Sequence, residues 1–279
     1  MNIQWYPGHM TKAKRAMKED LKLIDLVIEL LDARVPVSSR NPDIDELAGQ
    51  KSRLILLNKA DMADEKTTSA WVAEFKKQGI HTIPIDARQK GFKKQVMDAV
   101  LYACWEKLER DKRRGIMNRP IRAMVVGIPN VGKSTFINSF AGKASAKTGN
   151  KPGVTRGNQW IHIDKQLELL DTPGILWPKF EDQKVGLDLA MIGSISDEVL
   201  NIEELAFEFL KYMSKAYPDK LAERYGLDTG MEALKMMEEI ARKRGCLKKG
   251  SEPDYEKAAK LIIDDFRSGR LGRLTIESV

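Results

Sequence analysis

A glycine-rich segment at residues 127–134 (GIPNVGKS) follows the pattern GxxxxGK[ST] and offers the chemistry of a phosphate-binding loop. Backbone N–H groups of such a loop, together with the positive end of the following helix, enclose phosphate oxygens. Lys133 can reach the outer phosphates, and the Ser134 hydroxyl can bind Mg²⁺. An apolar run typical of a strand precedes the loop, as this chemistry requires. The residues that we expect to contact phosphate are Asn130, Val131, Gly132, Lys133, Ser134 and Thr135.

A second segment, residues 171–174 (DTPG), follows the apolar run 167–170. Its aspartate would lie at the carboxyl end of a strand, where the ligands of parallel sheets collect. We expect Asp171 to hold Mg²⁺ through water. We expect the Gly174 N–H to contact a γ-phosphate, because glycine lets the chain approach closely. DTPG alone would be a common turn, and its position after the phosphate loop makes the functional interpretation specific.

Residues 58–61 (NKAD) match the NKxD pattern with which GTPases read their base, again at the end of an apolar run. Asp61 can accept hydrogen bonds from N1–H and the 2-amino group of guanine, a donor pair that adenine lacks. At ~1.5–3 kcal/mol per charge-assisted hydrogen bond, this predicts GTP over ATP by at least about a hundredfold. Asn58 would brace the neighbouring loops, and Lys59 would lie along the base. Helix capping in a polar turn is the alternative role for this segment.

The order of these motifs differs from that of an ordinary GTPase, because base reading (58–61) precedes the phosphate loop (127–134) and then the Mg²⁺ aspartate (171). The chain therefore resembles a circularly permuted GTPase. With WYPGHM at residues 5–10 and a helical appendage at the end, it resembles specifically the bacterial ribosome biogenesis GTPase A family. The resemblance implies a P-loop GTPase fold, binding of GTP and GDP with Mg²⁺, and contact with rRNA during late maturation of the large ribosomal subunit.

The resemblance assigns further roles to single residues. Residues 86–88 (DAR) stand in the place of a Ser-Ala-Lys loop, in which the Ala87 backbone N–H contacts guanine O6 and Arg88 takes the place of the lysine. Thr155 matches the switch threonine that closes on Mg²⁺. Asn130 matches an asparagine associated with K⁺-stimulated GTPases, where K⁺ supplies charge to the transition state. An amide that only stabilises the loop is the alternative for Asn130.

Activation of the attacking water is not explained by the nucleotide motifs. Many GTPases use a glutamine directly after the DxxG glycine, whereas this chain has Ile175 there. An apolar side chain cannot orient water, so hydrolysis is weak, needs a partner or uses another residue. His9 is the candidate, because the permutation should bring the N-terminus near the end of the DxxG segment and the family is thought to use this histidine. An exposed position or an RNA contact is the alternative for His9.

Apolar periodicity indicates how these motifs are positioned. Runs suited to strands at 25–32, 53–57, 81–85 and 122–126 alternate with helical patterns at 12–23, 64–78 and 92–110. This alternation predicts an α/β fold with a mostly parallel sheet flanked by helices. Residues 159–163 and 167–170 are typical of a hairpin. We expect a permuted GTPase domain at 1–180 and a small all-helical domain at 181–279. Apolar residues at helical spacing in the second domain are Leu205, Phe209, Met213, Leu234, Met237, Ile240, Ala258, Leu261 and Ile262.

Charge is distributed unevenly along the 279 residues, which carry a net +7. Residues 1–180 have 31 basic and 20 acidic residues, and residues 181–279 have 16 and 20. The first part is therefore the one to suspect of meeting a polyanion. In the second part, a local basic cluster suggests contact with RNA phosphates, with a solvated helix end as the alternative. Its members are Arg242, Lys243, Arg244, Lys248 and Lys249.

Two isolated cysteines and the lack of a signal-like or 20-residue apolar segment predict a cytoplasmic protein without membrane contact. We also expect the protein to be a monomer. The favoured interpretation is an enzyme that is also a switch: in the GTP state it binds the subunit precursor, and after hydrolysis it leaves. One alternative is an RNA-binding assembly scaffold with GTP as a structural ligand. Another is a GTPase acting on a different RNA, because a fold does not fix the partner.

Overall fold

The computed structural model describes residues 17–89, 91–116, 119–142, 159–174, 176, 182–228 and 230–279. They form two compact units. The sheet unit contains the described residues up to 176 together with Thr275–Val279, and the helical unit contains 182–274. His9, Thr155 and Ile175 lie outside the described residues. Within the described part of the chain, no helix is both long and apolar enough to cross a membrane.

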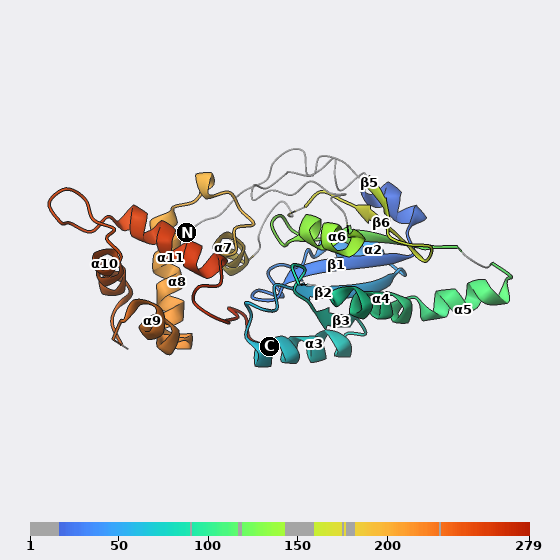
Figure 1. Cartoon of the computed structure of the whole chain (residues 1–279), viewed down its shortest axis with the longest axis horizontal. Coiled ribbons are helices and arrows are strands. Elements are labelled where there is room, and N and C mark those ends of the chain that lie inside the picture. Colours follow the sequence, from blue (N-terminus) through green and yellow to red (C-terminus); the bar gives the residue numbers. More distant parts are fainter. Residues whose placement is uncertain are drawn as a thin grey trace. The chain divides into compact units, whose positions relative to one another are not determined.

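The sheet unit is built on six strands in the order β3-β2-β1-β4-β6-β5. In Figure 1 they run from β3 at the lower edge of the sheet to β5 at the upper edge. All neighbours pair in parallel except β5 and β6, which are antiparallel. This confirms the predicted mostly parallel sheet. The strands are β1 (Leu26–Asp32), β2 (Ser52–Asn58), β3 (His81–Pro84), β4 (Ile121–Val126), β5 (Gln159–His162) and β6 (Leu167–Asp171).

Helices flank this sheet. The stretch predicted as one helix at 92–110 is divided at Cys104, and a short helix at 43–48 was not predicted. Rings of Phe92, Phe136 and Phe140 pack together and join α4 to α6. The elements are η1 (Leu21–Leu23), α2 (Asp43–Ala48), α3 (Glu65–Lys77), α4 (Phe92–Ala103), α5 (Trp105–Arg113) and α6 (Lys133–Ala141).

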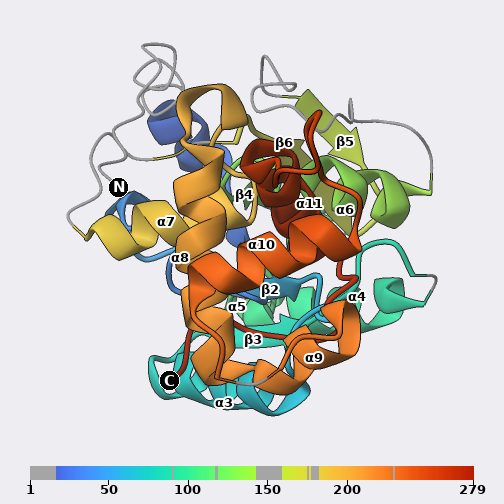
Figure 2. The same cartoon turned by 90° about the vertical axis from the view of Figure 1, so that its left-hand side faces the viewer.

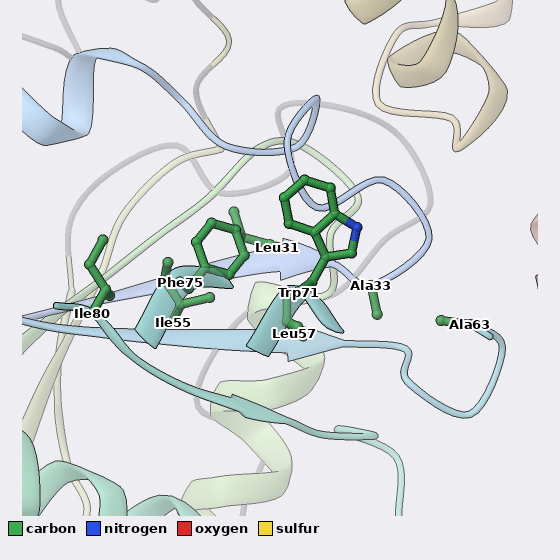
Figure 3. Packing of buried hydrophobic residues seen from close by; sticks show 8 residues of the cluster. All are labelled: Leu31, Ala33, Ile55, Leu57, Ala63, Trp71, Phe75 and Ile80. Atoms are coloured by element: carbon green, nitrogen blue, oxygen red, sulfur yellow. The ribbon is translucent and has the colours of Figure 1, made fainter. Parts of the chain in front are cut away.

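A hydrophobic cluster holds α3 against the centre of the sheet (Figure 3). Trp71 and Phe75, one turn apart on α3, lie over buried side chains of β1 and β2, and their ring centroids are 5.8 Å apart. Asp64 caps this helix by accepting a hydrogen bond from the Thr67 N–H. The cluster comprises Leu31, Ala33, Ile55, Leu57, Ala63, Trp71, Phe75 and Ile80.

The parallel strands deliver the predicted motifs to one edge of the sheet. Asp32 and Asn58 are register partners at the ends of β1 and β2. The phosphate loop follows β4, and Asp171 ends β6. Because the carboxyl ends of parallel strands meet at one edge, motifs more than a hundred residues apart become neighbours.

In the helical unit, α8 packs against α7, α9, α10 and α11, and Figure 2 shows these helices from a second direction. Leu205, Phe209 and Met213 on α8 are fully buried, as their spacing indicates. Leu234 is instead half exposed, because it occupies the first turn of α10 while Met236 and Met237 fill the core. The elements are α7 (Gln183–Met191), η2 (Asp197–Val199), α8 (Ile202–Ala216), α9 (Pro218–Tyr225), α10 (Ala233–Lys243) and α11 (Tyr255–Arg267).

Candidate nucleotide-binding site

Asn58 joins three segments at the carboxyl edge of the sheet. Its Nδ2 donates to the Val131 carbonyl oxygen at 2.8 Å, and its Oδ1 accepts from the Ala87 N–H at 3.1 Å. The side chain is 3% exposed, so both bonds are shielded from water. Asn58 therefore braces the phosphate loop against the loop at 86–88. The Ala87 N–H that the resemblance assigns to guanine O6 here donates to Asn58.

Lys59 extends from the base-reading motif to the phosphate loop. Its Nζ donates to the Asn130 carbonyl oxygen at 3.0 Å and to Asp32 Oδ2 at 2.8 Å. Lys59 and Asn130 both have left-handed backbones, with φ of 60° and 59°. Non-glycine residues adopt this conformation at a cost, and such residues gather at ligand sites.

Asp32 and Arg34 belong to this site and were missed by the sequence analysis. The available signal was the polar Asp32 at the end of a strand that is apolar except for Glu29 and that pairs with β2. The Arg34 guanidinium donates to both Asp32 oxygens at 2.8 Å, and both side chains are buried. Burial alone would raise the pKa of Asp32, but the charges of Arg34 and Lys59 hold that pKa well below its ordinary value.

The loop at 86–88 is held by its own aspartate. Asp86 Oδ1 accepts from the backbone N–H of Arg88 at 2.9 Å and from its Nε at 3.2 Å. Asp86, which stands in the place of the serine, thus supports the loop through its own side chain. Arg88 also donates to Asp61 Oδ2, so the predicted guanine-reading carboxylate lies beside the alanine loop.

Two glycines permit the backbone conformation of the phosphate loop. Gly127 has φ of +153°, and a Cβ there would lie 2.7 Å from the Leu30 carbonyl oxygen. Gly132 has φ of +101°, and a Cβ there would collide with the Asn58 amide. Larger residues would strain the backbone and displace either β1 or Asn58.

Lys133, Asp171 and Gly174 converge beyond this loop. Asp171 is 2% exposed, and Thr172 Oγ1 fixes the following turn by donating to the Val125 carbonyl oxygen at 2.7 Å. A Cβ on Gly174 would lie 2.9 Å from Pro129 Cα and 3.1 Å from Lys133 Nζ. Burial lowers the pKa of Lys133 to about 8, although Asp171 opposes this shift. Burial raises the pKa of Asp171, although Lys133 opposes it.

This arrangement suits a magnesium-bound phosphate. Asp171 Oδ1 is buried and accepts no hydrogen bond from the described residues. A carboxylate oxygen of this kind is an appropriate acceptor for a metal-bound water. Ser134, another predicted Mg²⁺ ligand, lies in the first turn of α6. The described residues contain no group of three or more His, Cys, Asp or Glu side chains able to hold a metal.

The basic cluster of the helical unit has a mixed character. Arg242 pairs with Glu239 at 2.7 Å, Lys243 donates to the Gly226 carbonyl oxygen, and Arg244 donates to the Arg224 carbonyl oxygen. These three residues thus have partners within the unit. Lys248 and Lys249 are exposed in the turn before α11 and form no ion pair with the described residues.

Comparison with known proteins gives consistent matches. Residues 122–225 match the model of a family described as 50S ribosome-binding GTPase. Ribosome biogenesis GTPase A of Bacillus cereus is 51% identical, and the alignment covers 100% of this chain and 94% of the relative. Ribosome biogenesis GTPase A of Thermotoga maritima is 37% identical, and the alignment covers 99% of this chain and 94% of the relative. Mitochondrial ribosome-associated GTPase 1 of Xenopus tropicalis is 32% identical over 98% and 94%.

Two solved structures of YlqF from T. maritima are also similar. The GDP-bound structure has a TM-score of 0.69 and 31% identity, covering 95% of this chain and 99% of that one. The GNP-bound structure has a TM-score of 0.68 and 32% identity, covering 96% and 98%. Both likenesses therefore extend over the sheet unit and the helical unit.

Proposed function

The chain belongs to the ribosome biogenesis GTPase A family of GTP-hydrolysing enzymes, and from this premise we propose that it acts in late maturation of the large ribosomal subunit. In the GTP state it binds the precursor subunit through rRNA, and it leaves after hydrolysis to GDP. This role in subunit maturation would place the protein in the cytoplasm. The names of its relatives and the nucleotides bound in the similar structures support this assignment.

One structural observation carries the nucleotide assignment. Asn58 of the base-reading motif is hydrogen-bonded to both the phosphate loop and the 86–88 loop. These bonds hold three segments separated in sequence next to one another, which supports a shared binding site for a guanine nucleotide. Asp61 reads the base, Lys133 contacts the outer phosphates, and the amide of Gly174 reports the γ-phosphate.

Two cations complete the proposed chemistry. Mg²⁺ is held by Ser134, Thr155 and, through water, Asp171, and it offsets phosphate charge. K⁺ beside Asn130 adds positive charge where an arginine finger acts in other GTPases. Removal of Mg²⁺ by EDTA should abolish hydrolysis, and replacement of K⁺ by Na⁺ should slow it.

The test of the proposed function is steady-state GTP hydrolysis in K⁺ buffer, with and without isolated large ribosomal subunits. Wild type is compared with His9→Ala, which should retain GTP affinity and lose the stimulated turnover. His162→Ala is the matched control, because this histidine lies on the edge strand β5 with a side chain 65% exposed.

The outcomes separate the candidate functions. If ribosomal subunits stimulate hydrolysis by wild type and His162→Ala but not by His9→Ala, the result supports a ribosome-activated switch with a catalytic histidine. Stimulation that survives in His9→Ala removes His9 from the mechanism. GTP binding without any stimulation favours an assembly scaffold or a different RNA partner.

RNA contact by the helical unit is assigned first to Lys248 and Lys249. Replacing both lysines with alanine should weaken subunit binding and reduce its dependence on salt. The slope of the logarithm of the binding constant against the logarithm of the salt concentration should become smaller by about one for each lost phosphate contact. An unchanged slope would instead make this turn an ordinary solvated surface.

A further inference from the structure

The last residues of the chain return to the sheet unit. We define the C-terminal clasp as residues 275–279, which follow directly from the helical unit but pack with the sheet unit. The Ile276 N–H donates to the Arg34 carbonyl oxygen at 2.8 Å. Glu277 accepts from the N–H groups of Val37 at 2.6 Å and Ser38 at 2.8 Å, and also from the Ser38 hydroxyl.

Two further contacts anchor the same segment to α3. The Trp71 Nε1–H donates to the Glu277 carbonyl oxygen at 3.2 Å, and the Asp64 N–H donates to Thr275 Oγ1 at 3.0 Å. In Figure 3 the indole nitrogen lies on the side of Trp71 that faces away from Phe75. Glu277 is 8% exposed. Hydrogen bonds to a shielded carboxylate are stronger than those between neutral groups, so the clasp fixes residues 34–38 firmly.

Arg34 connects the clasp to the nucleotide site. The clasp holds the Arg34 backbone, and the Arg34 side chain holds Asp32 through two hydrogen bonds of 2.8 Å. Asp32 in turn holds Lys59, whose Nζ is bonded to the phosphate loop at Asn130. Each link is a direct contact between buried or partly buried groups, and together they form an unbroken path from the chain's end to the phosphate loop.

We propose that Asp32, Arg34 and Glu277 are positioning residues of the nucleotide site, and that docking of the C-terminal clasp and binding of a guanine nucleotide favour one another. Lys59 must be held in place to lie along the base, and the clasp supports the loop that holds it. Because binding free energies are reciprocal, the nucleotide must strengthen clasp docking as much as the clasp strengthens nucleotide affinity. Since the clasp continues from the helical unit, a partner that pulls on that unit's carboxyl end would weaken nucleotide binding.

The reciprocal effect can be measured in the wild-type protein. Amide hydrogen exchange is followed at Ile276, Val37 and Ser38, whose N–H groups form the clasp bonds, with and without GDP and Mg²⁺. Exchange at these amides should slow by about tenfold more than at Ile80, whose N–H is bonded to Phe75 at the opposite end of the strands. Equal slowing at all four amides would show general stabilisation only and would overturn the coupling.

A variant tests the other direction. Glu277→Ala should raise the GDP dissociation constant about tenfold, equivalent to about 1.4 kcal/mol, while Ser278→Ala, an exposed neighbour, should leave it unchanged. Glu277→Gln keeps one acceptor oxygen and should fall between them. A role confined to stability would lower the thermal midpoint and leave GDP affinity intact, and that result would refute the proposal.

Two controls keep the test interpretable. The inference rests on the guanine site proposed above, so GDP binding by wild type is measured first, and its absence would reject that site rather than the clasp. Should Glu277→Ala fail to fold, Trp71→Phe removes one donor to the clasp while keeping an aromatic ring in the core. Its GDP affinity should fall by a smaller factor, and wild-type affinity combined with faster Ile276 exchange would overturn the proposal.

Discussion

The side chain of Lys133, which we propose contacts the outer phosphates, lowers the free energy of unfolding because it is buried. Its pKa falls from 10.5 to about 8 because burial penalises the ammonium group. At about 1.4 kcal/mol per pKa unit, the charged form costs about 3 kcal/mol of folding free energy at neutral pH. Because the folded-state pKa of this base is lowered, the penalty is complete below pH 8 and disappears as pH rises through 10.5.

Replacing Lys133 with Met should therefore stabilise the nucleotide-free protein while weakening nucleotide binding. Urea unfolding at pH 7 should show a gain of about 3 kcal/mol, shrinking to about 1 kcal/mol near pH 9.5 as the wild-type lysine loses its proton. Lys165→Met, at an exposed position, serves as control and should show neither effect. A gain that does not vary with pH would mean that side-chain packing, and not charge burial, is its source.

Base selection is the second property that we expect to depend on one side chain. The Asp61 carboxylate lies beside the loop that holds Ala87, and its Oδ2 accepts from Arg88. In Asp61→Asn, an amide with one acceptor oxygen and one donor NH₂ group replaces the two acceptor oxygens that would face the N1–H and 2-amino groups of guanine. The affinity for GDP should therefore fall by about a hundredfold. Affinity for the xanthine nucleotide, which carries oxygen in place of the 2-amino group, should rise. Titration with both nucleotides checks this, and an unchanged preference would remove the guanine assignment from Asp61.

Single elements were largely predictable, because apolar strands and helical periodicity depend on local sequence. The strands at 26–32 and 52–58 agree with the expected runs to within a residue or so, since their side chains are buried on both faces. Helix α2 was missed because its six residues follow two prolines in a polar segment. The contacts of Asp32 with Arg34 and Lys59 could not be inferred, because they depend on strand register and on long-range packing.

Within the helical unit, Asp265 links α9 to α11. It is fully buried and accepts from the Arg224 guanidinium at 2.9 and 3.0 Å, from the Tyr225 hydroxyl at 3.0 Å and from Arg270 at 2.9 Å. Burial alone would raise the pKa of Asp265, but these hydrogen bonds outweigh it and hold the pKa below 3.8. The contribution of Asp265 to stability is therefore present above pH 3.8 and is lost as pH falls through the lowered value.

Asp265→Asn should destabilise the helical unit by about 2–3 kcal/mol, because the partly buried Arg224 guanidinium and the exposed Arg270 lose the buried anion that they share. Circular dichroism during urea unfolding measures this change. Asp264→Asn is the neighbouring control, since the Asp264 side chain is 63% exposed and its ion pair contributes little. Similar losses in both variants would argue against a special role of the buried carboxylate.

At the scale of the whole molecule, the chain forms the helical unit as an insertion. The described residues up to 176 and the clasp at 275–279 belong to the sheet unit, while 182–274 lie between them in sequence. The predicted division near residue 180 did not anticipate the return of the last five residues, because no local pattern in TIESV indicates docking on a distant loop. Each unit nevertheless has a hydrophobic core of its own, which is what independent unfolding requires.

This organisation predicts two separable unfolding transitions. Phe209, fully buried and 4.9 Å from the Phe266 ring, belongs to the helical core, so Phe209→Ala should cost that unit about 3–5 kcal/mol. Residues 182–274 contain no tryptophan. The measurement uses a background with Trp5→Phe and Trp177→Phe, so tryptophan fluorescence follows Trp71, Trp105 and Trp160 of the sheet unit, whereas circular dichroism follows both units.

In Phe209→Ala, part of the dichroism change should move to lower urea while the fluorescence midpoint stays in place. GDP at a hundred times its dissociation constant should add about 2.7 kcal/mol to the fluorescence transition alone, since a ligand stabilises only the unit that binds it. A fluorescence midpoint that falls together with the dichroism would show that the units unfold as one. Joint unfolding would mean that the helical unit supports the nucleotide site through more than the clasp, because Phe209→Ala changes only the core of the helical unit.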